Sequence, residues 1–163
     1  MTDQDVHGRS TALRQAAADE LAERLKGLAV RLADTGVRPK RVWFGRGYLK
    51  RLSPVGFVLE PLGPQLLLPD GRLWSYHSRG NPRGRFFDPR VDHAACAHGP
   101  LSLGGRDFVF LGVVVHGYSF GYLHHDGVDY SPDHVDLCAI AGHSTPPRFA
   151  RPDDAFADIA DKL

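Results

Sequence analysis

Cysteine, methionine, tryptophan and long apolar runs are all scarce in this chain of 163 residues. The two cysteines, Cys96 and Cys138, have no spacing that metal sites or redox motifs use, so we expect two reduced thiols. A membrane-spanning helix needs about 20 consecutive apolar residues, and the sequence contains no such run. The first residues, MTDQDVHGRS, are polar and acidic, which argues against a secretory signal. We therefore expect a cytoplasmic protein that does not act at a membrane.

Charge is distributed unevenly along the chain, although its net value is only +1. Residues 38–90 carry eleven Lys and Arg against three Asp and Glu, whereas residues 91–163 carry four against ten. Such a split can mark an acidic partner for the basic segment. The interpretation favoured for the charge split itself is that the basic and acidic segments pair with each other across one sheet.

Residues 10–35 have the pattern of an amphipathic helix. Ser10 or Thr11 can cap its start and Gly36 can follow its last turn, which leaves residues 1–9 as a disordered tail. The apolar stripe recurs at steps of three or four residues and consists of Leu13, Ala17, Leu21, Leu25, Leu28 and Leu32.

From residue 40 to about residue 142, short apolar runs alternate with turn signals instead. Asp70-Gly71, Gly104-Gly105 and Asp126-Gly127 supply the positive φ angles of tight hairpin turns. Asp153-Asp154 then begins a short C-terminal helix. These features predict a single α+β domain over residues 10–163, with the long N-terminal helix packed on a mainly antiparallel β-sheet of hairpins. The expected strands are 41–44, 56–60, 65–68, 72–76, 101–103, 107–115, 120–124 and 135–141.

Gly117-Tyr118-Ser119-Phe120-Gly121 matches the G-x-S-x-G nucleophile elbow of serine hydrolases. The motif requires a strand, a sharp turn and then a helix, but the chain reaches Asp126-Gly127 five residues after Gly121. That distance is too short for the helix. The pattern therefore favours a β-hairpin over a hydrolase site.

Histidines and aspartates are dense between residues 116 and 143. Imidazole and carboxylate are the ligands of hydrolytic zinc, manganese or iron centres, and His134 and Asp136 would share one face of a strand. No H-E-x-x-H motif accompanies them, so a metal-dependent hydrolase is an alternative hypothesis only. Its candidate ligands are His116, His124, His134, Asp136 and His143.

The segment RPKRVWFGRGYLKR, residues 38–51, carries six cations, no acid and the aromatic residues Trp43, Phe44 and Tyr48. Aromatic rings among cations can stack on bases while the cations hold phosphates, which makes single-stranded nucleic-acid binding a second alternative. Against it, the overall pI is about 7.9, and a dedicated nucleic-acid domain is expected above roughly 9.

The hypothesis that the sequence favours is a non-catalytic module, without a cofactor, that binds an acidic partner protein. Small bacterial inhibitors, immunity proteins and secretion chaperones have this general make-up. Residues 78–90, rich in Gly, Pro and Arg, predict a long exposed loop that together with a sheet edge contacts the partner. The expected contact residues are Trp43, Trp74, Tyr76, Arg79, Arg83, Arg85 and Arg90.

Overall fold

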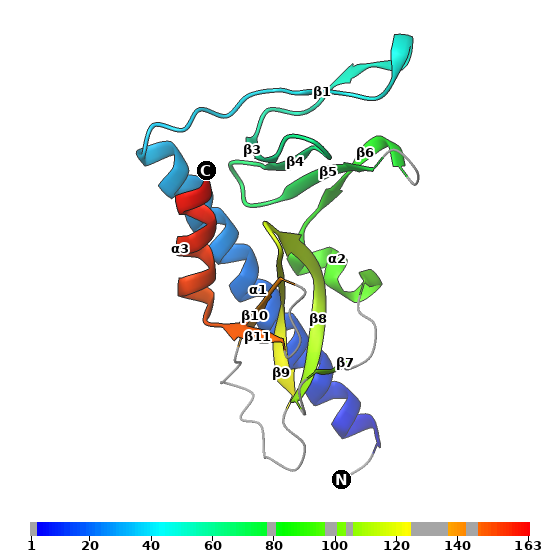
Figure 1. Ribbon diagram of the computed structural model, residues 1–163. Helices are drawn as coiled ribbons and strands as arrows, with labels where there is room; N and C mark the ends of the chain where they lie inside the picture. The colour runs from blue at the N-terminus through cyan, green and yellow to red at the C-terminus, as the bar shows by residue number, and fades with distance from the viewer. Residues whose placement is uncertain (1–2, 78–80, 97–100, 104–105, 125–136, 143–146) are drawn as a thin grey trace. The chain divides into compact units, whose positions relative to one another are not determined.

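The chain is an α+β protein built from three helices and three antiparallel sheets in its described part (Figure 1). The computed structural model describes residues 3–77, 81–96, 101–103, 106–124, 137–142 and 147–163. The chain groups into two compact units, and the single domain over residues 10–163 stays a prediction. The first unit is Met1–Leu21 with Pro89–Ala157, and the second unit is Ala22–Asp88 with Asp158–Leu163. No helix of the described part is both long and apolar enough to cross a membrane.

Helix α1 spans Asp3–Asp34. The expected start near Ser10 is therefore wrong, because residues 3–9, predicted to be a disordered tail, continue the same helix. The predicted end is confirmed. Gly36, at φ 89°, donates to the carbonyl of Ala33, and Val37 donates to that of Leu32, which is the Schellman arrangement. The predicted apolar stripe is confirmed too, because each of its six residues is at most 5% exposed.

The second unit contains a four-stranded sheet in the order β3-β4-β5-β6. The predicted turn between β4 and β5 is confirmed, and Gly71 in this turn lies against α1, since a Cβ there would be 3.0 Å from the backbone nitrogen of Lys26. The strands are β3 (Phe57–Glu60), β4 (Gln65–Leu67), β5 (Leu73–His77) and β6 (Asn81–Phe87).

Asp70 and Arg72 complete the same turn. The Asp70 carboxylate accepts the Arg72 backbone N–H at 3.1 Å and the Arg72 Nε–H at 2.7 Å. Partial burial raises the pKa of the Asp70 carboxyl, but the hydrogen bonds and charge of Arg72 outweigh it and hold that pKa below its ordinary value. The Arg72 guanidinium also lies over the ring of Phe86, 5.1 Å from its centroid, so the turn is tied to the edge strand β6.

A second, two-stranded sheet of the same unit forms a separate hairpin. Its strands are β1 (Trp43–Phe44) and β2 (Arg51–Leu52), and a 3₁₀ turn, η1 (Gly47–Leu49), lies at its tip. Hydrogen bonds between Lys40 and Gly56 extend the pairing to the base of the hairpin. We call residues 38–56 the arm, and Figure 1 shows it as a long ribbon beside the four-stranded sheet.

The first unit contains a five-stranded sheet in the order β11-β10-β9-β8-β7. Leu103 pairs with Arg106, which confirms the predicted antiparallel pairing of residues 101–103 with the following strand, whereas residues 104–105 and the predicted turn at residues 126–127 lie outside the described residues. The elements are α2 (Pro89–Cys96), β7 (Leu101–Leu103), β8 (Arg106–Val115), β9 (Tyr118–His124), β10 (Leu137–Ala141), β11 (Arg148–Ala150) and the first part of α3 (Pro152–Lys162), whose residues from Asp158 onward belong to the second unit.

Each face of this sheet packs its own apolar cluster. Phe120 on one face lies 5.0 Å from Phe156 of the predicted C-terminal helix α3, measured between ring centroids. The other face holds Phe108, Cys138 and Ile140, all at most 8% exposed. This two-sided burial explains why β8 reads as a nearly continuous apolar run.

The basic and acidic segments of the sequence do not share a sheet. Every named strand within residues 38–90 belongs to the two sheets of the second unit, and every named strand after residue 100 belongs to the five-stranded sheet of the first. The hypothesis that the two segments pair across one sheet is therefore wrong. The second unit carries fourteen Lys and Arg against seven Asp and Glu, a net charge of +7, and the first unit has −6.

Candidate binding surface

The serine of the G-x-S-x-G motif lies within strand β9 and not on a strand-to-helix turn. Ser119 pairs with Val114 of β8 on one side and with Ile140 of β10 on the other. The turn precedes the serine and is formed by His116 and Gly117, at φ 48° and 79°. Two consecutive residues with positive φ are the signature of a type I′ hairpin turn. The hairpin interpretation is thus confirmed, and no nucleophile elbow is present.

The two glycines of the motif have separate structural reasons. Gly117 supplies the positive φ of the turn, and a Cβ there would meet nothing within 4 Å. Gly121 lies in the middle of the sheet, where a Cβ would be 2.1 Å from the carbonyl oxygen of Val109 and 2.5 Å from the Phe108 ring. The turn explains Gly117, and the close packing of Val109 and Phe108 explains Gly121. Neither explanation involves Ser119.

Of the five candidate metal ligands, His116 alone has a described side chain. Its Nε2 is buried and has no hydrogen-bond partner among the described residues. His124 ends β9, and His134, Asp136 and His143 lie outside the described residues. Within the described ranges, no three His, Cys, Asp or Glu side chains come together as a metal site would require. The metal hypothesis stays a prediction.

The arginine-rich segment 78–90 is not a long loop. Residues 81–87 form the edge strand β6 and Pro89 begins helix α2, so the predicted loop is wrong over most of its length. Pro82 is compatible with an edge strand, because such a strand has a neighbour on one side only and does not need a backbone N–H at every residue. Gly84, at φ 78°, lies against the Trp74 indole, where a Cβ would be 2.2 Å from Cζ2.

The expected contact arginines have different positions. Arg83 and Arg85 are exposed on β6, and their side chains form no hydrogen bond or ion pair with the described residues. Arg90 is exposed in the first turn of α2, and its carbonyl accepts from Gln15. Arg79 lies outside the described residues. The edge strand β6 therefore presents two of the four arginines.

The three expected aromatic anchors differ in exposure. Trp43 is 64% exposed, whereas Trp74 is 2% exposed and belongs to the core of the second unit. Tyr76 is half-buried, with its ring 4.9 Å from that of Phe44. Trp74 is therefore not accessible to a partner. Phe44, 6% exposed and packed on Trp74, is likewise unable to stack on a base.

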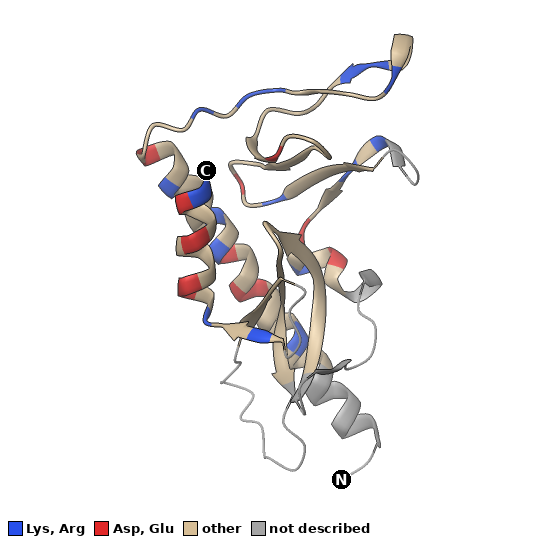
Figure 2. Cartoon of the chain, viewed as in Figure 1, with Lys and Arg blue, Asp and Glu red and all other residues tan. Residues whose placement is uncertain are grey.

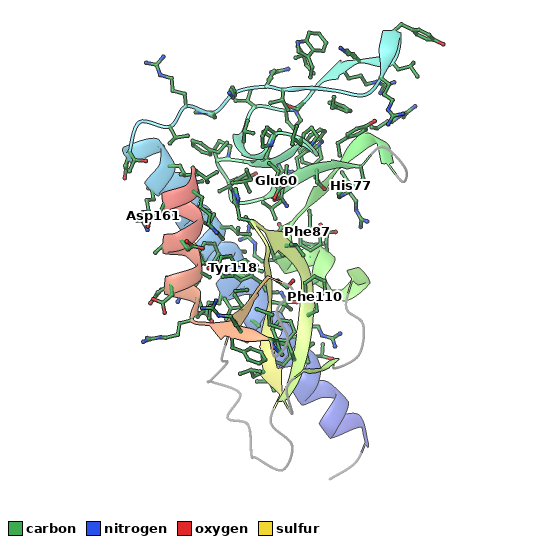
Figure 3. All side chains as sticks on the ribbon, viewed as in Figure 1. Glu60, His77, Phe87, Phe110, Tyr118 and Asp161 are labelled. Carbon is green, nitrogen blue, oxygen red and sulfur yellow. The ribbon has the colours of Figure 1, made fainter. Side chains whose placement is uncertain are left out.

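The arm concentrates cations without acids. Figure 2 shows Lys and Arg along it and no Asp or Glu, and the next acidic residue, Glu60, lies at the end of β3 in the four-stranded sheet (Figure 3). All six cations are exposed, and within the described part of the chain none of their side chains forms an ion pair. They are Arg38, Lys40, Arg41, Arg46, Lys50 and Arg51.

The arm also exposes large apolar side chains. Ten such residues are exposed in the described part of the molecule, and five belong to the arm. Exposed apolar residues scattered singly are ordinary, but a cluster indicates an interaction surface. The arm residues and their exposed fractions are Trp43 (64%), Tyr48 (98%), Leu49 (62%), Leu52 (47%) and Val55 (42%).

The sequence indicated Trp43 and Tyr48 but missed the three aliphatic residues. A two-residue strand such as β2 is too short to show the period of two by which Leu52 could have been assigned to the same face as Trp43.

Comparison of the chain with protein-family models, with curated proteins and with solved structures gives no significant match.

Proposed function

We propose that this chain is a non-catalytic binding module of the bacterial cytoplasm that holds an acidic partner protein on the basic second unit. The observation that carries the proposal is the segregation of charge. The unit that contains the arm and β6 has a net charge of +7, although the whole chain has +1. Clustered charge of one sign attracts a partner of the opposite sign and accelerates its association.

The cations of this surface are available for intermolecular contacts. Arg83 and Arg85 on β6 and the six cations of the arm have no acidic partner within the described part of the chain. An exposed guanidinium loses little hydration on meeting a carboxylate and can bond it with two parallel N–H groups. A protein surface rich in Asp and Glu fits these residues.

The experiment is capture from a nuclease-treated extract of the producing cells on the immobilised full chain, followed by mass spectrometry. We compare the wild type with Arg83→Glu/Arg85→Glu, and use Arg148→Glu/Arg151→Glu, two exposed arginines of the first unit, as the matched control. We expect an acidic protein that wild type and control retain and that the β6 variant binds about tenfold more weakly, since 1.4 kcal/mol corresponds to tenfold. Equal retention by all three proteins would refute the role of β6.

Single-stranded nucleic acid is the second candidate, and one observation favours it. Trp43 and Tyr48 are exposed among six cations, in a unit whose own net charge is +7 although the overall pI is 7.9. Such a surface can bind phosphates and stack on bases. Affinity for an oligonucleotide that falls steeply between low and moderate salt would support this candidate.

A further inference from the structure

We infer that the arm anchors the proposed interface and that the partner segment seated on it combines large apolar side chains with carboxylates. This inference rests on the function proposed above and specifies the chemistry of the partner. Its three supports are the rigid base of the arm, the apolar composition of its outer face and the uniform sign of its charge.

The base of the arm is fixed before any partner binds. Ser53, fully buried, accepts the Val42 backbone N–H with its hydroxyl oxygen at 2.8 Å and donates to the carbonyl of Pro54 at 2.9 Å. The backbone N–H of Ser53 donates in turn to the carbonyl of Val42. The Ser53 hydroxyl oxygen thus takes the place of a backbone carbonyl as the acceptor for the Val42 N–H. It does so where the strand pairing shifts by one residue, between the pairs Lys40–Gly56 and Trp43–Leu52.

Phe44 attaches this base to the four-stranded sheet. Its ring lies 4.9 Å from the rings of both Trp74 and Tyr76, with an edge-to-face arrangement against the indole. Consecutive residues of a strand point to opposite faces, so the burial of Phe44 directs Trp43 outward. A partner therefore meets a preorganised surface, and little conformational entropy is lost when the two associate.

The outer face of the arm carries two exposed apolar side chains that are cross-strand neighbours. Trp43 is directly opposite Leu52 in the β1–β2 pairing, and paired residues of an antiparallel sheet present their side chains on the same face. Tyr48 and Leu49 follow at the tip, within η1. Tryptophan and tyrosine are the residue types most enriched at the energetic centres of protein interfaces. The side chains that extend from the arm are drawn in Figure 3.

Charge and apolarity together distinguish the two classes of partner. A single-stranded nucleic acid would use Trp43, Tyr48 and the cations, but would leave Leu49, Leu52 and Val55 without apolar contact. A protein segment that carries both Leu or Phe and Glu or Asp satisfies all of these side chains at once. The exposed aliphatic residues therefore favour a protein segment.

The experiment compares three probes of equal charge on the full chain. The first is a peptide with Leu and Phe placed among Glu residues, the second has Ser in place of Leu and Phe, and the third is oligothymidylate. Acrylamide quenching reports the site, because Trp43 is exposed and Trp74, the other tryptophan, is 2% exposed. We expect the first peptide to protect Trp43 from the quencher and to bind at least tenfold more tightly than the other two probes.

Variants test the residues by calorimetric titration of the first peptide. Trp43→Ala and Leu52→Ala should each weaken binding at least fivefold, while Val91→Ala, a matched change at an exposed apolar residue of the first unit, should not change it. Unchanged circular dichroism spectra confirm that the variants fold.

Each other outcome overturns the inference in a recognisable way. Equal affinity for the two peptides would leave an electrostatic protein interface without an apolar anchor, and the function proposed above would stand. Tightest binding of oligothymidylate would assign the arm to nucleic acid. If no probe binds, the arm is not a site of this chemistry, and the capture experiment with the β6 variant decides the proposed function separately.

Discussion

Replacing Gly121 by alanine is the most direct test of the five-stranded sheet. Gly121 lies in β9, opposite Phe110 of β8 and Cys138 of β10. A Cβ at this position would lie 2.1 Å from the carbonyl oxygen of Val109 and 2.5 Å from Cζ of Phe108. Neither neighbour is the end of a flexible side chain, because one is backbone and the other is a ring that is 1% exposed.

The cost follows from these distances. Ordinary van der Waals contact of a Cβ begins at 3.4 Å, so the carbonyl oxygen would have to retreat by about 1.3 Å. Overpacking of a core costs about 1–3 kcal/mol and occasionally more. Two simultaneous clashes with immobile atoms indicate the upper end, about 3 kcal/mol, out of a typical stability of about 5–15 kcal/mol. For a chain of this length, that is a fall in Tm of about 6–12 °C.

Thermal unfolding followed by circular dichroism measures the effect, and Gly27→Ala is the matched control. Gly27 lies within α1, and a Cβ there would meet nothing within 4 Å. Alanine is favoured over glycine inside a helix by about 1 kcal/mol, so this variant should raise Tm. Replacing glycine by alanine should thus lower Tm at Gly121 and raise it at Gly27. If Gly121→Ala unfolds at the temperature of the wild type, the packing of Phe108 over β9 is wrong.

Three further predictions concern the arm, the β4–β5 turn and the histidine cluster. Ser53→Ala leaves the Val42 N–H without its acceptor, so we expect a loss of about 1–3 kcal/mol and faster amide exchange of Val42, measured by hydrogen–deuterium exchange; an unchanged exchange rate would contradict the bond. Because the folded state lowers the pKa of Asp70 below 3.8, the stabilisation by its contact with Arg72 is complete above that pH and is lost as pH falls through the lowered value. Urea midpoints of Asp70→Asn should lack this decline, and parallel curves for both proteins would refute the assignment. Elemental analysis of protein purified without a metal-affinity tag should find no stoichiometric zinc, manganese or iron; such a metal, if lost in His134→Ala, would replace the binding hypothesis by the hydrolase hypothesis.

Periodic features of the sequence predicted the fold wherever one local rule decided the structure. The Leu and Ala stripe of α1 needs only the helical period, and Gly36 ends the helix by the φ angle that it alone adopts easily. The hairpin around Ser119 was predicted because the chain leaves no room for a helix between Gly121 and Asp126. In each case the controlling residues are neighbours in sequence.

The edge strand β6 could not be predicted in this way. Its Gly, Pro and Arg composition is typical of a loop, and it forms a strand because Gly84 lets the backbone approach the indole of Trp74, ten residues away. Helix α2 did carry a local signal. Pro89 suits a first helical position, and the buried His93 ring is 2.7 Å from the Pro89 carbonyl oxygen. The signal was missed because the Gly, Pro and Arg content of residues 78–90 favoured a loop.

The candidate site shows the same limit. The sequence does not distinguish Trp43, Trp74 and Tyr76, which are all large aromatic residues in predicted strands. Packing in the core decides which of their side chains are exposed. Because Phe44 packs on Trp74 and Tyr76, its neighbour Trp43 is exposed, whereas Trp74 is buried. Sequence predicts that one of two adjacent strand residues points outward. Whether Trp43 or Phe44 points outward depends on the four-stranded sheet, whose residues come later in the sequence.

Electrostatic binding to the arm depends on nearby charges more than on the net charge of the chain. At physiological ionic strength the field of an exposed charge decays over about 8 Å, so a ligand on the arm responds mainly to charges near it. Along the chain those charges are positive from Arg38 to Arg51, and the first acid is Glu60. An overall charge of +1 is therefore a poor guide to what this surface binds. Raising the salt concentration should weaken the acidic peptide without apolar residues far more than the peptide with Leu and Phe, because apolar burial is not screened by ions.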